Sequence, residues 1–299
     1  MRSSGAPVVA GGSADVERRL AALLGSAAEA RWIADDVLGR PRPTGPVPPD
    51  ARVAMEDMAS RRLAGVPLQY VLGRWAFRTL ELVVDERVLI PRPETEQVVE
   101  VALGELARVA RSGAPPTVAD LGTGSGAIAL SVAAEAGGVA PGVSVSATDV
   151  SPDALEVAAA NRRLLAATHP DAAARVVLAE GSWWDALPQD LAGRLGLVVA
   201  NPPYVAVDEW PDLDAEVRAE PYGALVAAPG SDGTPGLAAV ETIVRGAARW
   251  LTRGGAVVVE IAPHQSTAAQ ACARSAGFTR VEVRPDLAGR ARVLVAGGS

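Results

Sequence analysis

The chain has 299 residues, 49% of them hydrophobic, which allows one large or two ordinary domains with a substantial core. Its formal net charge of −7 at pH 7 argues against a general nucleic-acid binder, which normally carries a clear basic excess. No apolar run approaches the ~18 residues of a membrane helix, and no signal sequence follows Met1. The single cysteine, Cys272, excludes an internal disulfide. We therefore expect a cytoplasmic protein without a metal site.

The first ninety residues predict three regions. Residues 1–13 are rich in Gly, Ser and Ala and are expected to be disordered. Over residues 14–73 the apolar residues recur at helical spacing, which predicts a small α-helical bundle of about four helices. Residues 74–90 alternate apolar and polar residues around Asp85 and Glu86, as a β-hairpin linker would.

Residues 91–299 alternate between strand and helix patterns. The expected strands lie near 118–121, 143–148, 175–178, 197–200, 256–261, 279–284 and 291–296, and the expected helices near 95–110, 126–136, 152–166, 236–251 and 265–276. This alternation predicts an α/β fold with a doubly wound, mostly parallel sheet, whose ligands bind at the carboxyl ends of the strands.

A glycine-rich turn follows the first strand of this domain. Asp120 and Leu121 lead into Gly122-Thr123-Gly124-Ser125-Gly126, and glycine lets the backbone adopt positive φ and approach a ligand closely. Asp149 ends the next strand, where an acid can bind the two hydroxyls of a ribose. A phosphate-binding P-loop is excluded because the chain has no lysine. The glycines and the acid fit NAD and S-adenosylmethionine equally well.

A second turn, Asn201-Pro202-Pro203-Tyr204, decides between the two ligands. It follows the apolar run 197–200, and its prolines stiffen the backbone. The Asn201 side-chain oxygen and the Pro202 carbonyl are two acceptors that suit a planar NH₂ group, with Tyr204 against its π-face. Such a turn serves the methylation of an adenine, a cytosine or a carboxamide nitrogen and has no use in nicotinamide chemistry. The alternative is a plain Pro-Pro turn after a buried strand.

The segment after this turn, residues 205–234, is long and carries seven acids. Long loops in compact domains are usually functional or disordered. Its position directly after Tyr204 makes it a candidate lid that faces the substrate.

With these motifs the chain resembles the PrmC/HemK family, which methylates the glutamine of the Gly-Gly-Gln motif in class I peptide-chain release factors. The resemblance covers roughly residues 15–296. It also rests on Pro67–Gly73, on Ile90-Pro91-Arg92-Pro93-Glu94-Thr95-Glu96, on Glu220-Pro221 and on Asp286–Arg292. The Ile90–Glu96 stretch is the most specific of these motifs.

The resemblance implies a class I S-adenosylmethionine-dependent methyltransferase fold and a role for each motif. The donor would be held by Asp120, Gly122, Thr123, Gly124, Ser125, Gly126, Asp149, Trp183 and Asn201. The catalytic and substrate-binding turn would be Asn201, Pro202, Pro203 and Tyr204, with Phe77 and Arg92 near the substrate. The helical bundle of residues 14–73 would serve substrate recognition by gripping the release factor. Many relatives have an acid where this chain has Ser182, which leaves open whether that position makes a polar contact to adenine N6.

These features lead to one preferred function and two alternatives. We expect an S-adenosylmethionine-dependent protein-(glutamine-N5) methyltransferase that acts on class I release factors and so tunes translation termination. An N6-adenine methyltransferase would use the same catalytic turn but needs a basic face or a target-recognition domain, and neither is evident. A non-catalytic module of methyltransferase fold is disfavoured because both motifs are intact.

Overall fold

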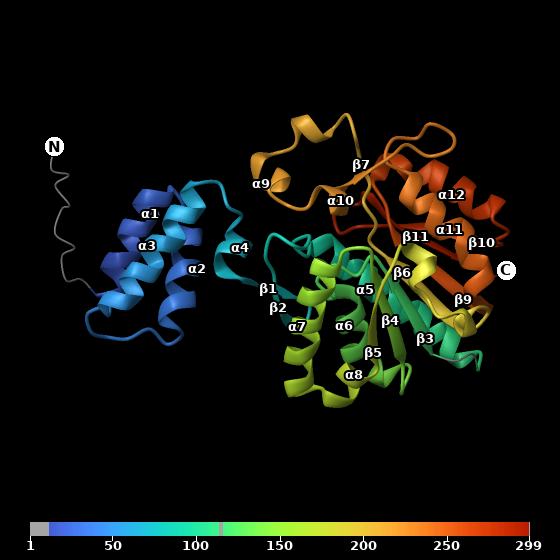
Figure 1. Cartoon of the computed structure of the whole chain (residues 1–299), viewed down its shortest axis with the longest axis horizontal. Coiled ribbons are helices and arrows are strands. Elements are labelled where there is room, and N and C mark those ends of the chain that lie inside the picture. The colour runs from blue at the N-terminus through green and yellow to red at the C-terminus, as the bar shows by residue number, and fades with distance from the viewer. Residues whose placement is uncertain (1–11, 114–115, 299) are drawn as a thin grey trace. The chain divides into compact units, whose positions relative to one another are not determined.

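The computed structural model describes residues 12–113 and 116–298 and divides into two compact units, residues 1–73 and 74–299 (Figure 1). Each unit has its own hydrophobic core. Of the stretch predicted to be disordered, residues 1–11 lie outside the described residues. Ser13, at its end, begins the first helix.

The N-terminal unit consists of four helices over its described residues. They are α1 (Ser13–Leu24), α2 (Ala27–Leu38), α3 (Pro49–Leu63) and α4 (Leu68–Leu72). Gly25 ends α1 in the left-handed conformation, and the Ser26 hydroxyl then caps α2 by accepting from the Glu29 amide. Ile33, Met55 and Leu68 are among the side chains that meet in its core. The predicted helical spacing therefore corresponds to a packed bundle.

The second unit begins with an antiparallel hairpin, β1 (Arg74–Phe77) and β2 (Leu80–Val83). The expected hairpin is present, but its turn lies at Arg78, where φ is +51°, and not at Asp85 and Glu86. The Arg78 guanidinium donates to Glu135 Oε2 at 2.6 Å, which holds the turn in place. Asp85 instead begins a separate turn, closed by the Val88 amide.

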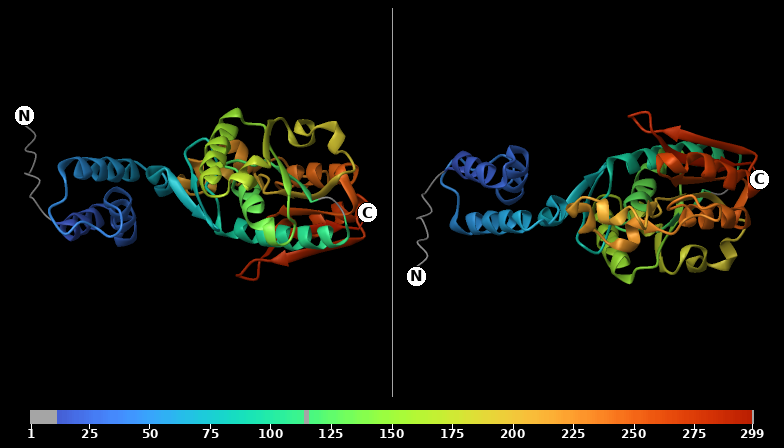
Figure 2. Two further views of the ribbon diagram at one scale, coloured as in Figure 1. Left: turned by 90° about the horizontal axis from the view of Figure 1, so that it is seen from below. Right: turned by 90° about the horizontal axis from the view of Figure 1, so that it is seen from above.

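A seven-stranded sheet forms the centre of this unit, in the order β10-β11-β9-β6-β3-β4-β5. Its strands are β3 (Thr117–Leu121), β4 (Ser144–Asp149), β5 (Val176–Glu180), β6 (Leu195–Ala200), β9 (Leu251–Glu260), β10 (Arg280–Pro285) and β11 (Ala291–Gly297). All pairs are parallel except those of β11, which is antiparallel to both β9 and β10. The β10–β11 hairpin, in red, lies at one edge in Figure 2. The predicted doubly wound, mostly parallel sheet is confirmed.

Helices cover both faces of the sheet because successive strand residues point to opposite sides. On one side Val118, Leu197 and Val258 pack against α5 (Pro93–Arg111), α6 (Ala127–Glu135) and the end of α7 (Pro152–Thr168) with α8 (Pro170–Ala174). On the other side Ala119 and Val198 pack against α11 (Ala238–Trp250) and α12 (Ser266–Ser275). None of the helices described is long and apolar enough to span a membrane.

The candidate lid, residues 205–234, contains short regular elements. They are β7 (Val205–Ala206), α9 (Ala215–Arg218), α10 (Tyr222–Leu225) and β8 (Val226–Ala227), with β7 parallel to β8. The buried carboxylate of Glu220 accepts from the Ile90 amide at 2.9 Å and from the Arg92 guanidinium. The segment is thereby attached to the residues that precede α5.

Candidate active site

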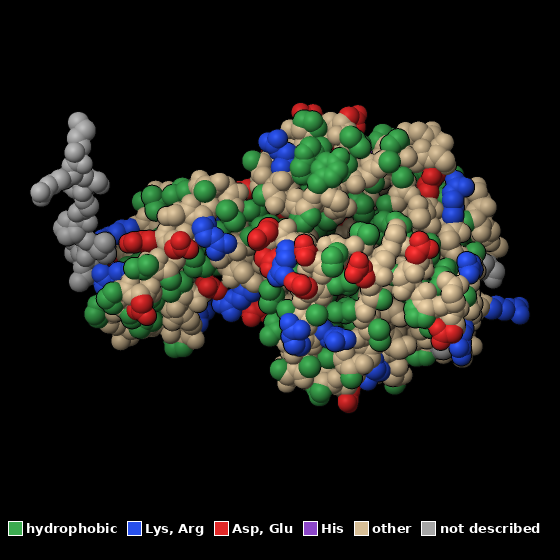
Figure 3. Space-filling model, in the orientation of Figure 1, with side chains coloured by type: hydrophobic (Ala, Val, Ile, Leu, Met, Phe, Trp, Pro, Cys, Tyr) green, Lys and Arg blue, Asp and Glu red, His purple; other side chains and the backbone are tan. Residues whose placement is uncertain are grey.

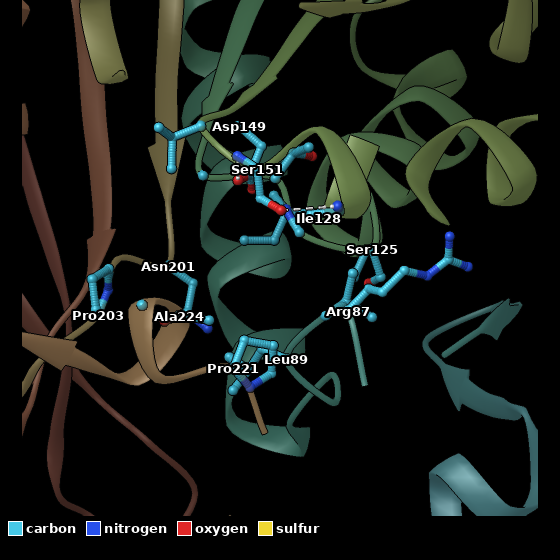
Figure 4. Close-up of a pocket in the computed structure, with 18 of the residues that line it drawn as sticks. Arg87, Leu89, Ser125, Ile128, Asp149, Ser151, Asn201, Pro203, Pro221 and Ala224 are labelled. Atoms are coloured by element: carbon cyan, nitrogen blue, oxygen red, sulfur yellow. Dashed lines mark hydrogen bonds between the residues drawn. The ribbon is translucent and has the colours of Figure 1, made fainter. Parts of the chain in front are cut away.

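A cavity of about 400 Å³ opens at the carboxyl ends of β3, β4 and β6, where the fold predicts a ligand site (Figure 4). Figure 4 shows Asp149, Ser151 and Ile128 toward one end of it. Asn201, Pro203, Pro221 and Ala224 lie toward the other. The cavity therefore brings the two sequence motifs into a single site.

The glycine-rich turn has the backbone that its glycines require. Gly122, Gly124 and Gly126 have φ of +74°, +54° and +83°, a region that L-residues with a side chain rarely adopt. The Gly122 and Thr123 amides donate to the Thr148 carbonyl at 2.9 and 2.8 Å, so β4 holds the turn. Gly122, Thr123, Gly124 and Ser125 line the cavity, whereas Gly126 caps α6 behind it.

Asp120 lies beneath this turn and does not line the cavity. Its Oδ2 accepts from the Thr123 hydroxyl at 2.6 Å and from the Ala129 amide at 3.1 Å. Complete burial raises the pKa of Asp120 to about 7, with a smaller contribution from the negative charge of Asp149. Its structural role is to support the turn.

Asp149, at the end of β4, lines the cavity with its carboxylate tied to the backbone. Oδ2 accepts from the Gly124 amide at 2.8 Å and Oδ1 from the Ser151 amide at 3.0 Å. A carboxylate has about four acceptor positions, so two remain for other donors. These suit a pair of vicinal hydroxyls.

Trp183 follows β5 and also lines the cavity, with the unusual φ of +45° for a bulky residue. Its ring lies against Gly122, where an added Cβ would be 3.3 Å from the ring. The neighbouring Trp184 stacks on Trp250 at 5.9 Å between ring centroids. Trp184 therefore packs against α11, whereas Trp183 presents apolar surface to the cavity.

The second turn begins where β6 ends. Asn201 and Pro203 line the cavity, and the Asn201 Nδ2 donates to the Thr95 hydroxyl at 3.1 Å. The Tyr204 amide donates to the Leu225 carbonyl at 3.1 Å, and its hydroxyl lies 3.4 Å from Glu260 Oε1. Burial, aided by the negative charge of Glu260, raises the pKa of Tyr204, so this phenol is neutral near neutral pH.

Some residues expected at the site lie outside the cavity lining. Phe77 is 1% exposed and packs in the core beneath the sheet, so the expected substrate contact is replaced by a packing role. Arg92 pairs with Glu220 and fastens the lid segment. Pro202 and Tyr204 stand next to lining residues without lining the cavity themselves.

Sequence reasoning missed several residues that the fold brings to the site. Leu89, Pro91, Pro221, Gly223 and Ala224 complete the apolar end of the cavity. They come from loops and from the four-residue helix α10, which show no periodic pattern, although some belong to motifs quoted above. Asn161 on α7 is 1% exposed, and its Nδ2 donates to the Ser125 carbonyl at 2.9 Å. Only its polarity on a buried helix face could have indicated it.

Comparison with known proteins accounts for most of the chain. Sequence profiles match residues 14–73, described as the PrmC N-terminal domain, and residues 106–215, described as a methyltransferase small domain. A release factor glutamine methyltransferase of Bordetella pertussis is 43% identical over 89% of this chain and 92% of its own length. One from Deinococcus radiodurans is 38% identical over 89% of each chain.

The chain belongs to the release factor glutamine methyltransferase family. A solved methyltransferase from Pyrococcus furiosus has a TM-score of 0.52 and 15% identity, covering 82% of this chain and 99% of that one, a likeness that shows the fold alone. Members of the family use S-adenosylmethionine as methyl donor. The residues present fit this donor, because the cavity combines free acceptor positions on Asp149, the exposed glycine backbone and the apolar face of Trp183.

Proposed function

We propose that this chain methylates the side-chain amide nitrogen of the glutamine in the Gly-Gly-Gln motif of class I release factors, in the cytoplasm, and so tunes translation termination. The observation that carries the proposal is the single cavity shared by the glycine turn and the Asn201 turn. Family membership supports the same activity. The site residues named below are part of the proposal.

At the donor end, the chain would hold the methionine part on the backbone of Gly122–Ser125 and the ribose hydroxyls on Asp149. The apolar face of Trp183 would pack against adenine. S-adenosylmethionine, when bound, supplies a methyl group on a sulfonium that a nitrogen lone pair can displace in line. No strong base on the protein is needed for that chemistry.

At the acceptor end, the Asn201 side-chain oxygen and the Pro202 carbonyl would each accept one N–H of the glutamine amide. A carboxamide nitrogen is a poor nucleophile because its lone pair is delocalised into the carbonyl. Two fixed acceptors orient the nitrogen toward the methyl group, and such orientation is worth several kcal/mol. They also stabilise the positive charge that develops on nitrogen.

The charges at the site favour a slim, neutral acceptor. Among the lining residues only Arg87 and Asp149 are charged, and the Arg87 guanidinium is held by Asp85 at 2.7 Å and Glu156 at 2.9 Å. Leu89, Pro91 and Pro221 make the acceptor end apolar. A glutamine flanked by glycines can enter such an opening because its backbone carries no neighbouring side chains.

An adenine of a nucleic acid is the less favoured acceptor. A duplex base would have to be flipped out, at a cost of a few kcal/mol, and its phosphates held by basic groups. The lid segment instead exposes six acids, Asp208, Glu209, Asp212, Asp214, Glu216 and Asp232. Acidic and basic side chains are interspersed over the described residues on the face drawn in Figure 3.

The test is mass spectrometry of a purified release factor after incubation with the enzyme and S-adenosylmethionine. We expect a single methyl group on the Gly-Gly-Gln glutamine and none on a Gln→Ala variant of the release factor. DNA and RNA incubated in parallel should remain unlabelled. Labelled nucleic acid beside an unlabelled release factor would overturn the proposal in favour of the adenine methyltransferase.

A further inference from the structure

The Asn201 amide is the last group in a buried chain of hydrogen bonds that starts on a different strand. Glu260 ends β9 and is 1% exposed; its Oε2 accepts from the Thr95 hydroxyl at 2.8 Å. Thr95 is in the first turn of α5 and is 3% exposed. Its oxygen in turn accepts from Asn201 Nδ2 at 3.1 Å. Three elements distant in sequence therefore meet through one hydroxyl.

The direction of these hydrogen bonds follows from the chemistry of the groups. Burial raises the pKa of Glu260, and the Thr95 hydroxyl, the positive charge of Arg292 and the Tyr204 hydroxyl oppose this shift. The ionised carboxylate only accepts, so the single Thr95 proton then points toward Glu260, as in the structure. The Thr95 oxygen then has only lone pairs to offer to Asn201. Of the two ends of the Asn201 amide, only the NH₂ can meet a lone pair, which turns the side-chain oxygen away from Thr95.

The other carboxylate oxygen is also engaged on the catalytic turn. The Tyr204 hydroxyl donates to Glu260 Oε1 at 3.4 Å. The Tyr204 carbonyl lies 3.4 Å from Nε2 of Gln265, which is 0% exposed and also donates to the Pro235 carbonyl at 3.0 Å. Tyr204 is thus held by Glu260, which ends β9, and by Gln265, which follows β9. Asn201 is linked to Glu260 through Thr95.

We propose that Thr95, oriented by Glu260, is a positioning residue that fixes which end of the Asn201 amide faces the acceptor. Without this constraint the two orientations of the Asn201 amide differ little in energy. In the wrong orientation the Asn201 NH₂ would face the NH₂ of the acceptor glutamine, and neither group can accept a hydrogen bond from the other. The inference rests on the proposed function, because it assigns a task to the nitrogen-binding turn. It also gives a role to Thr95 of the Ile90–Glu96 motif, for which no contact with S-adenosylmethionine is proposed.

The test compares three variants of the full chain. Thr95→Val keeps the shape of the side chain and removes the hydroxyl, whereas Thr95→Ser keeps the hydroxyl. Ser131→Ala removes an equally buried hydroxyl from α6 and is the matched control. For each we measure kcat and KM on the release factor, the donor Kd by calorimetry, and Tm.

We expect kcat of Thr95→Val to fall about 10- to 100-fold, the size of effect that misplacing a reacting group produces. Its donor Kd and KM should stay within about threefold of wild type, since the donor and the rest of the acceptor are bound elsewhere. Thr95→Ser and Ser131→Ala should retain kcat within about threefold. A purely structural role would instead lower Tm and donor affinity together.

Two results overturn the inference: a Thr95→Val enzyme with wild-type kcat, or a folded Thr95→Ser enzyme that loses kcat about tenfold. The second applies even if Thr95→Val fails to fold. An NMR readout separates this inference from the proposed function. The side-chain amide signal of Asn201, assigned by its loss in Asn201→Ala, should shift in Thr95→Val and not in Ser131→Ala, whatever the substrate; an unchanged signal counts against the inference.

Discussion

At the scale of single residues, the site separates groups that contact a ligand from groups that hold those contacts. Asn201 and Asp149 line the cavity, while Asp120 lies behind it and binds the glycine turn. Thr95 reaches the lining beside Asn201 and holds the Asn201 side chain. The two classes should fail differently when mutated. Loss of a lining residue changes one binding or rate constant, whereas loss of a supporting residue changes stability or orientation.

Asn201→Ala should keep donor binding and lose most turnover. The donor is proposed to lie on the glycine turn, whereas Asn201 is proposed to hold the acceptor nitrogen. We expect kcat/KM to fall by about 2–4 kcal/mol of transition-state stabilisation, as for other pre-aimed polar groups. Steady-state kinetics beside calorimetry with S-adenosylmethionine measure both quantities. Near wild-type turnover would show that this turn is not catalytic.

The buried Asp120 should make stability depend on pH. Its folded pKa of about 7 lies above the ordinary 3.8, so its contribution to stability is fully present below about pH 4 and is lost as the pH rises through 7. At about 1.4 kcal/mol per pH unit the loss is roughly 4 kcal/mol. The asparagine of Asp120→Asn stays neutral at every pH, so this variant should not show the loss of stability. Urea unfolding of both proteins at pH 4.5 and pH 8, without donor, measures the difference; parallel pH profiles would contradict this.

At the scale of elements, the Asn201–Tyr204 turn depends on a close approach by the segment that precedes α11. Gly236 has φ of +65°, and an added Cβ would be 2.1 Å from the Tyr204 carbonyl oxygen. The Gln265 side chain binds the same carbonyl. The position of the turn is therefore set by β6 from one side and by these two segments from the other.

Gly236→Ala should displace the Tyr204 carbonyl and lower turnover strongly, in addition to a backbone cost of about 1–2 kcal/mol. Gly233→Ala is the matched control, because Gly233 has φ of +84° with no atom within 4 Å of an added Cβ. It should show the backbone cost alone in thermal unfolding and keep its turnover. Equal turnover in the two variants would mean that the close approach does not position the turn.

The elements were more predictable from sequence than the contacts among them. The expected strand at 197–200 and helix at 95–110 correspond to β6 and α5, because apolar runs and helical periodicity are local signals. The hairpin turn was misplaced because Arg78, a non-glycine residue with positive φ, gives no turn signal. Thr95 and Glu260 are 165 residues apart, and no local pattern indicates that they meet.

At the scale of the whole molecule, the two units have separate cores. The core of the helical unit uses residues 20–71, and the two cores of the second unit begin at Phe77 and at Ala119. Over its described residues the helical unit exposes four large apolar side chains, Leu23, Trp32, Val53 and Leu63.

Deleting residues 1–73 should separate donor binding from recognition of the release factor. The remaining unit contains every residue of the cavity, so it should bind S-adenosylmethionine with near-native affinity. Methylation of the whole release factor should fall much more than donor affinity. Calorimetry and methyl-transfer assays on the folded truncation measure both. An equal loss of both activities would indicate that the helical unit supports the fold and not recognition.

Asn161 connects the glycine-rich turn to the β1–β2 hairpin at the start of the second unit. Its amide pairs with both the N–H and the carbonyl of Val83, at 2.7 and 3.0 Å, while also binding the Ser125 carbonyl. Donor that steadies Ser125 should therefore slow opening of the β1–β2 hairpin, and linkage makes the effect reciprocal. Amide hydrogen exchange at Val83 should slow when S-adenosylmethionine is added, and this slowing should vanish in Asn161→Ala. The stability of the hairpin that follows the helical unit would then depend, through the Asn161 side chain, on whether S-adenosylmethionine is bound.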